Sequence, residues 1–167
     1  MTFGKLLKNA LSLALTIWLM SAIVDYWRRP EMPPEMAQMT LTDLNGYSHN
    51  LAKISQDRPI IVYFWGSWCG YCRYTSPAIN QLAQEGETVM AIALRSGSAE
   101  KVQHYLNAQQ LSFTTINDPN GDLAARWQVR VTPTIILLHR GKMDIATTGW
   151  TSLWGLKARI WLSKIFA

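Results

Sequence analysis

The sequence predicts an α/β domain with a partly parallel central sheet that helices cover on both faces. The first observation is a set of apolar runs rich in β-branched or aromatic residues, which suit buried strands: 59–65, 89–94 and 133–139. The second is that segments with apolar residues at helical spacing stand between these runs. Strands that alternate with helices along a chain build a sheet of this kind.

The elements of the domain are expected in the following order. Residues 40–50 alternate in polarity around Asn45-Gly46 and predict a short hairpin. Strand 59–65 leads into a helix over 69–85, in which Pro77 should produce a kink. The remaining elements are a strand over 89–94, a helix over 99–109, a short strand over 113–116, a turn at 118–121 that leads into a helix through 127, and a hairpin of 133–139 with 143–148.

A final helix is expected from its cap at Thr151 to about Ser163. Its apolar residues have mixed helical spacing, and we interpret it as a closing helix that packs on the sheet. Its charged residues should then lie solvated on the outer face. The same charges, on Lys157, Arg159 and Lys164, keep open the alternative of a helix on a membrane surface.

Composition limits the class of protein. The 167 residues fit one domain, and a chain that is 49% apolar and 16% charged can bury a core, which excludes intrinsic disorder. Part of the net charge of +5 comes from Lys5, Lys8, Arg28 and Arg29, which flank an apolar segment. Because no dense basic run occurs elsewhere, we expect no nucleic-acid partner.

The N-terminal segment predicts a membrane anchor. Residues 9–24 carry no charge, and with Tyr26 and Trp27 as an interfacial belt the span approaches the ~30 Å of a hydrocarbon core. The alternatives are a cleaved signal peptide, whose small-x-small site is not evident here, and a buried soluble helix. The expected organisation is a cytoplasmic tail (1–8), a transmembrane anchor (9–27), a Pro-rich linker (28–39) and a globular domain (40–167).

The linker carries three prolines, at 30, 33 and 34, which favour an extended polyproline II segment. Residues 30–38 would then be a semi-rigid spacer of roughly 30 Å. The methionines at 32, 36 and 39 could be soft ligands for Cu(I), against the plainer interpretation of a spacer near the membrane.

The chemistry of the chain centres on its two cysteines, Cys69 and Cys72, at the start of the helix over 69–85. Residues three apart on a helix share a face, so the two thiols can close a small disulfide ring. The N-terminus of a helix favours negative charge and therefore stabilises a thiolate, to which Arg73 could add. We expect Cys69 at the helix tip to attack and Cys72, one turn down, to resolve the mixed disulfide.

Other uses of the pair fit the sequence less well. A c-type haem site needs His after the second cysteine, and residue 73 is Arg. A zinc site needs two further ligands, and the histidines at 49, 104 and 139 are isolated. A purely structural disulfide across four residues closes almost no loop and stabilises little. Redox chemistry without metal or cofactor is therefore the expected activity.

Several separated motifs resemble the thioredoxin superfamily: Phe64-Trp65-Gly66-Ser67-Trp68-Cys69-Gly70-Tyr71-Cys72, then Pro77, then Val131-Thr132-Pro133-Thr134. Asp118-Pro119-x-Gly121 with Trp127-x-Val129 is similar to its membrane-tethered extracytoplasmic branch, which includes the TlpA, ResA and suppressor-of-copper-sensitivity D proteins. The resemblance covers about 40–163. It implies a thioredoxin-like fold, with a central mixed β-sheet flanked by helices, after one N-terminal transmembrane helix.

The resemblance also implies an activity and a location. The chain is expected to be a thiol–disulfide oxidoreductase of the bacterial cell envelope, held in the inner membrane by a single pass with its globular domain in the periplasm. Its partners would be periplasmic protein thiols and disulfides, in the reducing direction, and a transmembrane electron donor of the DsbD type. Pro133 should be a cis-proline beside the cysteines, with the backbone of Thr132 pairing with an extended substrate. Active-site support is expected from Trp68, Gly70, Tyr71, Arg73, Thr132 and Pro133.

The chain departs from these families at several positions. Thioredoxins carry a buried Asp where this chain has Tyr63, and ResA-like reductants carry a Glu where it has Thr75. The Gly70-Tyr71 dipeptide lacks the proline common between the cysteines, and the Glu-bearing loop of cytochrome c maturation reductants is absent before Pro133. The alternative function is a non-enzymatic, membrane-tethered thioredoxin-fold chaperone or a copper-binding adaptor with a role in copper tolerance.

Overall fold

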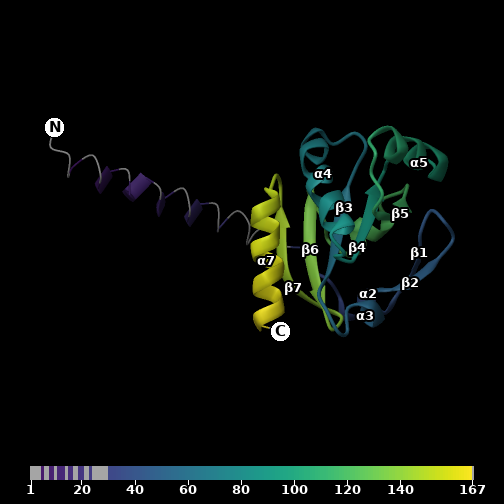
Figure 1. The fold of residues 1–167 in the computed structure, drawn as a ribbon, viewed down its shortest axis with the longest axis horizontal. Coiled ribbons are helices and arrows are strands. Elements are labelled where there is room, and N and C mark those ends of the chain that lie inside the picture. The colour runs from purple at the N-terminus through teal and green to yellow at the C-terminus, as the bar shows by residue number, and fades with distance from the viewer. Residues whose placement is uncertain are drawn as a thin grey trace.

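A five-stranded mixed sheet forms the centre of the molecule (Figure 1). The computed structural model describes residues 5, 8–9, 11–13, 15–16, 19–20, 23 and 30–166. In sheet order, the strands are β5 (Thr114–Asp118), β4 (Val89–Leu94), β3 (Ile60–Trp65), β6 (Thr134–His139) and β7 (Lys142–Thr148). β3, β4 and β5 are parallel, whereas β6 runs antiparallel to β3 and β7 antiparallel to β6. The predicted mixed sheet is confirmed.

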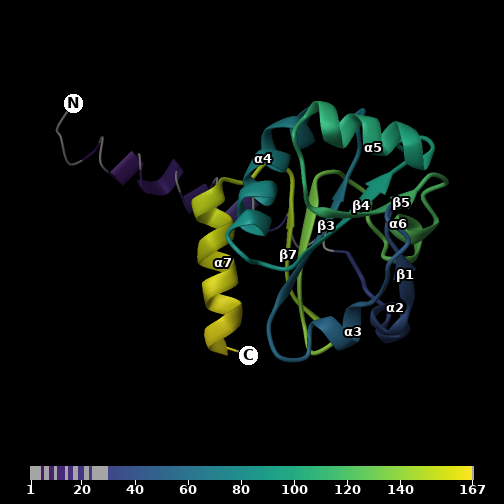
Figure 2. The same ribbon diagram turned by 45° about the vertical axis from the view of Figure 1, so that its right-hand side comes forward.

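Helices cover both faces of the sheet (Figures 1 and 2). Because side chains alternate along a strand, Ile61, Tyr63 and Trp65 of β3 face one core, while its even-numbered residues face the other. The first core is closed by α4 (Gly70–Gln84), α5 (Ala99–Ala108) and α7 (Leu153–Phe166). The second is closed by α2 (Pro34–Gln38), α3 (Leu51–Ile54) and α6 (Asp122–Arg126). The central strand is thus buried on both sides, as its apolar sequence predicts.

The predicted hairpin is present as β1 (Thr40–Thr42) and β2 (Ser48–Asn50). Its turn is organised by Asp43, whose carboxylate accepts hydrogen bonds from the backbone N–H groups of Asn45 and Tyr47 and lies 2.8 Å from His49 Nε2. Burial alone would raise the pKa of Asp43, but the hydrogen bonds from His49 and the two backbone groups outweigh it and lower that pKa. This carboxylate stabilises a turn.

The extended spacer predicted over 30–38 is wrong, because residues 34–38 form α2. Pro34 is the first helical residue, where a missing N–H is tolerated. Met36 is only 4% exposed and packs in the second core, so it is not free to bind Cu(I). Among the described residues, no group of three or more His, Cys, Asp and Glu side chains could hold a metal ion.

The closing helix α7 packs on the sheet through Leu156 and Ile160, as predicted. Ser152, not Thr151, caps it, since Ser152 Oγ accepts from the N–H of Gly155 at 3.2 Å. The expectation of solvated charges on its outer face is wrong. That face exposes apolar side chains instead: Trp154, Trp161, Leu162 and Ile165.

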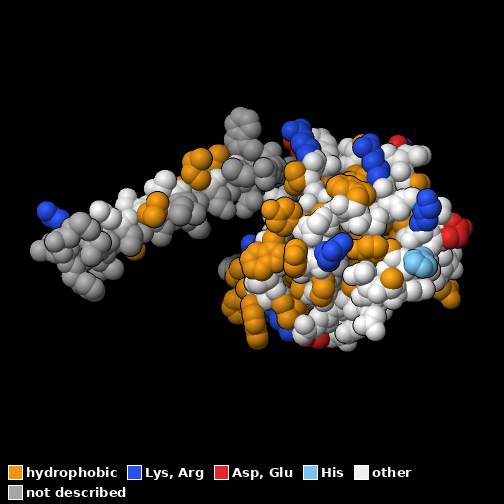
Figure 3. All heavy atoms as spheres, turned by 90° about the horizontal axis from the view of Figure 1, so that it is seen from above, with side chains coloured by type: hydrophobic (Ala, Val, Ile, Leu, Met, Phe, Trp, Pro, Cys, Tyr) orange, Lys and Arg blue, Asp and Glu red, His pale blue; other side chains and the backbone are white. Residues whose placement is uncertain are grey.

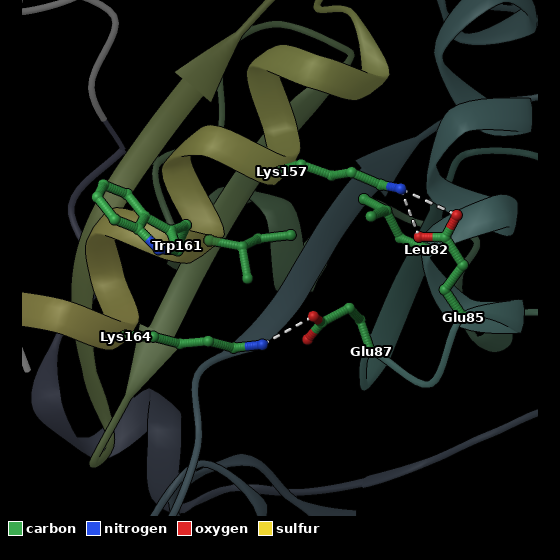
Figure 4. Close-up of a pocket in the computed structure, with 7 residues that line it drawn as sticks. Leu82, Glu85, Glu87, Lys157, Trp161 and Lys164 are labelled. Atoms are coloured by element: carbon green, nitrogen blue, oxygen red, sulfur yellow. Dashed lines mark hydrogen bonds and ion pairs between the residues drawn. The ribbon is translucent and has the colours of Figure 1, made fainter.

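The lysines of α7 face α4 and its following turn (Figure 4). Lys157 pairs with Glu85, and Lys164 pairs with Glu87, each at 2.8 Å. The two ion pairs border a pocket of about 260 Å³, whose buried members are Leu82 and Ile160. They bind α7 to the end of α4 that is far from the cysteines, because α4 begins immediately after Cys69.

The described part of the chain includes no helix with the length and hydrophobicity needed to cross a membrane. The predicted anchor over 9–27 and tail over 1–8 fall mostly outside the described residues.

Candidate active site

Cys69 and Cys72 form a disulfide where β3 gives way to α4. Their Cα atoms are 5.3 Å apart. Cys69 is the N-cap of α4, and its Sγ accepts a hydrogen bond from the N–H of Cys72 at 3.2 Å. Cys69 is 7% exposed and Cys72 only 1%, so Cys69 is the more accessible residue. The roles of attacking and resolving thiol stay predictions, and the difference in exposure between Cys69 and Cys72 is the observation that bears on them.

The loop between β3 and Cys69 is bound to the end of β4. The indole N–H of Trp68 donates to the carbonyl of Leu94 at 3.0 Å. The backbone N–H of Ser67 donates to Ser96 Oγ at 2.9 Å, and that hydroxyl donates in turn to Leu94 at 3.2 Å. Two hydrogen bonds therefore hold the residues that precede Cys69, and a third fixes the Ser96 hydroxyl that accepts one of them.

The Thr132–Pro133 peptide bond is cis, as predicted. Sheet register brings this loop to the cysteines, because Thr134 of β6 pairs with Phe64 of β3. The carbonyl of Pro133 accepts from the N–H of Gly149 at 2.8 Å, just after β7. Pro133 is buried and Thr132 is half-buried, so the backbone before the proline lies at the surface.

Hydroxyl groups occupy the positions where related families carry acids. Tyr63 and Ser76, both buried, are hydrogen-bonded through their hydroxyls at 2.9 Å. Burial raises the pKa of Tyr63 far above its usual value, and the hydrogen bond with Ser76 offsets this only in part. Thr75 donates to the carbonyl of Tyr71 at 3.2 Å. The buried carboxylates among the described residues, Asp43 and Asp118, belong to the β1–β2 turn and the start of α6.

Exposed aromatic residues stand next to the cysteines in the chain, before α4 and in its first two turns. Trp68 and Tyr71 are 59% and 67% exposed, and Tyr74 is 71% exposed. Gly70, Tyr71, Arg73 and Tyr74 line a groove of about 400 Å³ on the outer side of α4. Figure 3 looks toward the end of the molecule where α4 begins and shows hydrophobic and basic side chains across the face, with acidic ones at its margins.

Sequence reasoning identified the cysteines and Pro133 but missed Tyr74, which lines the groove, and Ser96, which holds the loop before Cys69. Tyr74 could have been found, since it lies three residues after Tyr71 on the same helix face. Ser96 has no local signal, because its contact with Ser67 spans 29 residues.

Comparison with known proteins agrees with this geometry. Residues 34–147 match the AhpC/TSA family. The chain is 54% identical to a thioredoxin-like protein of Haemophilus influenzae over 166 residues, which cover 99% of each chain. It is 28% identical to the soluble secreted antigen MPT53 of Mycobacterium tuberculosis over 103 residues, or 61% of this chain and 59% of the antigen.

Solved structures show the same fold. A secreted Mycobacterium tuberculosis disulfide oxidoreductase homologous to Escherichia coli DsbE superimposes with a TM-score of 0.66 at 27% identity, over 77% of this chain and 98% of that one. A putative thiol:disulfide interchange protein DsbE from Chlorobium tepidum superimposes with a TM-score of 0.65 at 26% identity, over 75% of this chain and 92% of that one. The fold is therefore thioredoxin-like, as predicted.

The predicted location as a single-pass inner-membrane protein is wrong. No helix among the described residues can span a membrane, and the two mycobacterial proteins compared above are secreted.

Proposed function

This chain belongs to the AhpC/TSA family of thioredoxin-like proteins, and from that membership we propose that it is a thiol–disulfide oxidoreductase acting on protein clients outside the cytoplasm. The observation that carries the proposal is the Cys69–Cys72 disulfide at the start of α4, with Cys69 more exposed than Cys72. Two thiols in this position can alternate between a dithiol and a disulfide without distortion of the helix.

The reaction begins on the reduced pair. The Cys69 thiolate attacks a client disulfide, so that one S–S bond forms to Cys69 and one breaks within the client. The released client sulfur leaves as a thiolate and takes up a proton. Cys72, as its thiolate, then attacks the sulfur of Cys69, closes the Cys69–Cys72 bond and frees the second client sulfur. Two electrons pass to the client, and the reverse sequence oxidises a client dithiol.

The residues around the pair support this sequence. The N–H of Cys72 and the N-terminus of α4 stabilise negative charge on Cys69 Sγ. The surface backbone at Thr132, beside Pro133, offers an edge to an extended client segment. Gly70 leaves the turn between the cysteines open, while Trp68, Tyr71 and Arg73 contact the client.

We propose that the protein works mainly in the reducing direction and is itself reduced by a transmembrane electron donor of the DsbD type. No His stands between the cysteines, and such a His would favour the reduced pair and make the disulfide more oxidising. Tyr71 at that position carries no positive charge.

Insulin reduction by the full chain with dithiothreitol tests the proposal. Wild-type protein should accelerate precipitation of the insulin B chain, and Cys69→Ala should abolish the acceleration. Cys72→Ala is the matched control, because it should retain the attacking thiol and accumulate a mixed disulfide with insulin. If neither cysteine affects precipitation, the protein is a binding module without turnover, such as a chaperone.

A further inference from the structure

We infer that the groove beside Cys69 selects clients that carry an acidic side chain close to the reacting cysteine. The inference rests on the proposed function and names the substrate class of the same site. The occupant is an extended polypeptide segment with an acidic residue and an apolar residue near its cysteine.

The groove lies on the outer side of the first two turns of α4. Gly70, Tyr71, Arg73 and Tyr74 line it, and residues three or four apart on a helix lie on one face. It begins at the residue after Cys69, so a client held there is next to the attacking sulfur. Its volume of about 400 Å³ accommodates side chains of a peptide.

Arg73 is the charged group of this groove. Its exposed guanidinium has no hydrogen bond or ion pair with any of the residues that the structure describes. In contrast, Lys157 and Lys164 are both neutralised by glutamates. A free guanidinium presents a planar set of donors that matches a carboxylate in a bidentate arrangement.

The segments that flank the disulfide on the side of β6 and β7 carry no acidic side chain. Three of the segments at this end of the sheet, 66–74, 127–134 and 148–154, lie on the β6 side of β3, whereas the loop after β4 lies on its other side. These segments contain Arg73 and Arg130 but no Asp or Glu. On this side of the disulfide an acidic client segment therefore meets attraction, whereas a basic one meets repulsion; Glu100, in the first turn of α5, belongs to the opposite side.

Aromatic rings supply the apolar part of the contact. Trp68, Tyr71 and Tyr74 stand on the α4 side of the disulfide, and Trp150, which is 63% exposed, follows β7 next to the loop of Pro133. Arg73 is four residues from Cys69, a rise of about 6 Å along the helix. An extended client chain advances about 3.3 Å per residue, so about two of its residues span this rise. Because the Arg73 side chain can reach further along the client, the acidic residue is expected about two to four residues from the client cysteine.

The test uses the reduced full chain and disulfide-bonded peptides that differ at one residue, three positions after a cysteine: Glu, Gln or Lys. Single-turnover rates are measured by stopped flow. The rate should fall in the order Glu, Gln, Lys, with about three- to five-fold between Glu and Lys, the range of an exposed ion pair. The ratio should approach one in 0.5 M salt, because salt screens exposed charges.

Variants locate the effect. Arg73→Gln should bring the Glu/Lys ratio to about one, and Arg73→Lys should restore part of it. Each Glu/Lys ratio compares two peptides that react with the same protein variant. A change in the reactivity of Cys69 alters both rates equally and therefore does not affect the ratio. Arg58→Gln is the matched control, since the exposed Arg58 precedes β3 at the end far from the cysteines and the ratio should persist.

The outcomes separate the two proposals. Equal rates for all peptides with the wild-type protein, or a Glu preference that survives in Arg73→Gln, would overturn the acidic selectivity and leave the oxidoreductase activity standing. Failure of every peptide to react would overturn the proposed function itself.

Discussion

Gly66 lies directly against the indole of Trp68, so that a Cβ at position 66 would be 2.7 Å from the ring atoms Cε2 and Nε1. The missing side chain lets the indole fold back and donate to Leu94. Trp68 is therefore held in one orientation although it is more than half exposed. The glycine before the cysteines serves close packing of the active-site loop.

Gly66→Ala should displace the Trp68 ring and break its hydrogen bond to Leu94. Because the ring can move outward into solvent, we expect the free energy of unfolding to fall by only about 1 kcal/mol, the value of one hydrogen bond. The indole N–H resonance of Trp68 in a two-dimensional NMR spectrum should shift toward that of an exposed tryptophan. Gly70→Ala is the control, because an added Cβ there meets nothing within 4 Å. An unmoved Trp68 resonance in Gly66→Ala would contradict the packing argument.

Ser96→Ala should loosen the loop before Cys69. The substitution removes the acceptor of the Ser67 N–H and a donor to Leu94, at a cost of about 1 kcal/mol. Hydrogen exchange at the Ser67 amide should accelerate, and the rate of disulfide exchange should fall. Ser98→Ala is a matched control from the same loop, because its hydroxyl caps α5 instead. Equal protection of Ser67 in both variants would show that Ser96 does not position the loop.

Cys69, not Cys72, should be the thiol modified first in the reduced protein at neutral pH. Cys69 is the more exposed of the two and lies at the helix N-terminus, where a thiolate is stabilised. Brief alkylation followed by peptide mass spectrometry measures the ratio of the two products. Preferential labelling of Cys72 would reverse the assigned roles.

The sequence predicted the sheet well because its strands are continuous apolar runs, and the strand over 89–94 has the predicted bounds. α2 was missed because local signals dominate a sequence prediction. The pair Pro33-Pro34 favours an extended chain, and burial of Met36 against a distant core cannot be seen in the segment itself. The outer face of α7 was misjudged because that helix is apolar on two sides, and only the structure shows which one the sheet covers.

The residues of the candidate site also divide into those that the sequence predicted and those that only the fold brings together. Cys69, Cys72 and Pro133 belong to short motifs with a known spacing, so they could be found directly. Gly66 and Ser96 act through contacts with Trp68 and Ser67 that depend on the fold.

Tyr63→Phe should destabilise the protein and change its stability at alkaline pH. The variant leaves the buried hydroxyl of Ser76 without its partner, which costs about 1–3 kcal/mol. Burial raises the pKa of Tyr63 in the native state. Below pH of about 10, the pKa of an unfolded tyrosine, the phenol is therefore neutral in both the native and the unfolded state. Above that pH the unfolded chain loses this proton while the native state keeps it, so stability falls as pH rises.

Urea unfolding between pH 7 and 11 measures this dependence. The free energy of unfolding of Tyr63→Phe should be lower than that of the wild type at pH 7 and should decline less above pH 10. Tyr47→Phe, at an exposed tyrosine, should follow the wild type. Parallel curves for Tyr63→Phe and the wild type would exclude a linked ionisation of Tyr63.

The reduction potential of the Cys69–Cys72 pair tests the proposed direction. Equilibration with glutathione buffers, followed by acid trapping and a mass tag, should give a potential below about −180 mV, and a value near the −120 mV of strong oxidants would overturn the reducing assignment.

Tyr71→His provides the internal test, because a protonated imidazole between the cysteines stabilises the Cys69 thiolate and hence the reduced form. We expect this variant to raise the potential by about 30 mV, a tenfold change in the equilibrium constant. Tyr74→His places the imidazole one helical turn later and should shift the reduction potential less, since the effect of a charge on the thiolate falls with distance. Equal shifts in the two variants would mean that the residue between the cysteines does not set the potential, and the argument from Tyr71 would fail.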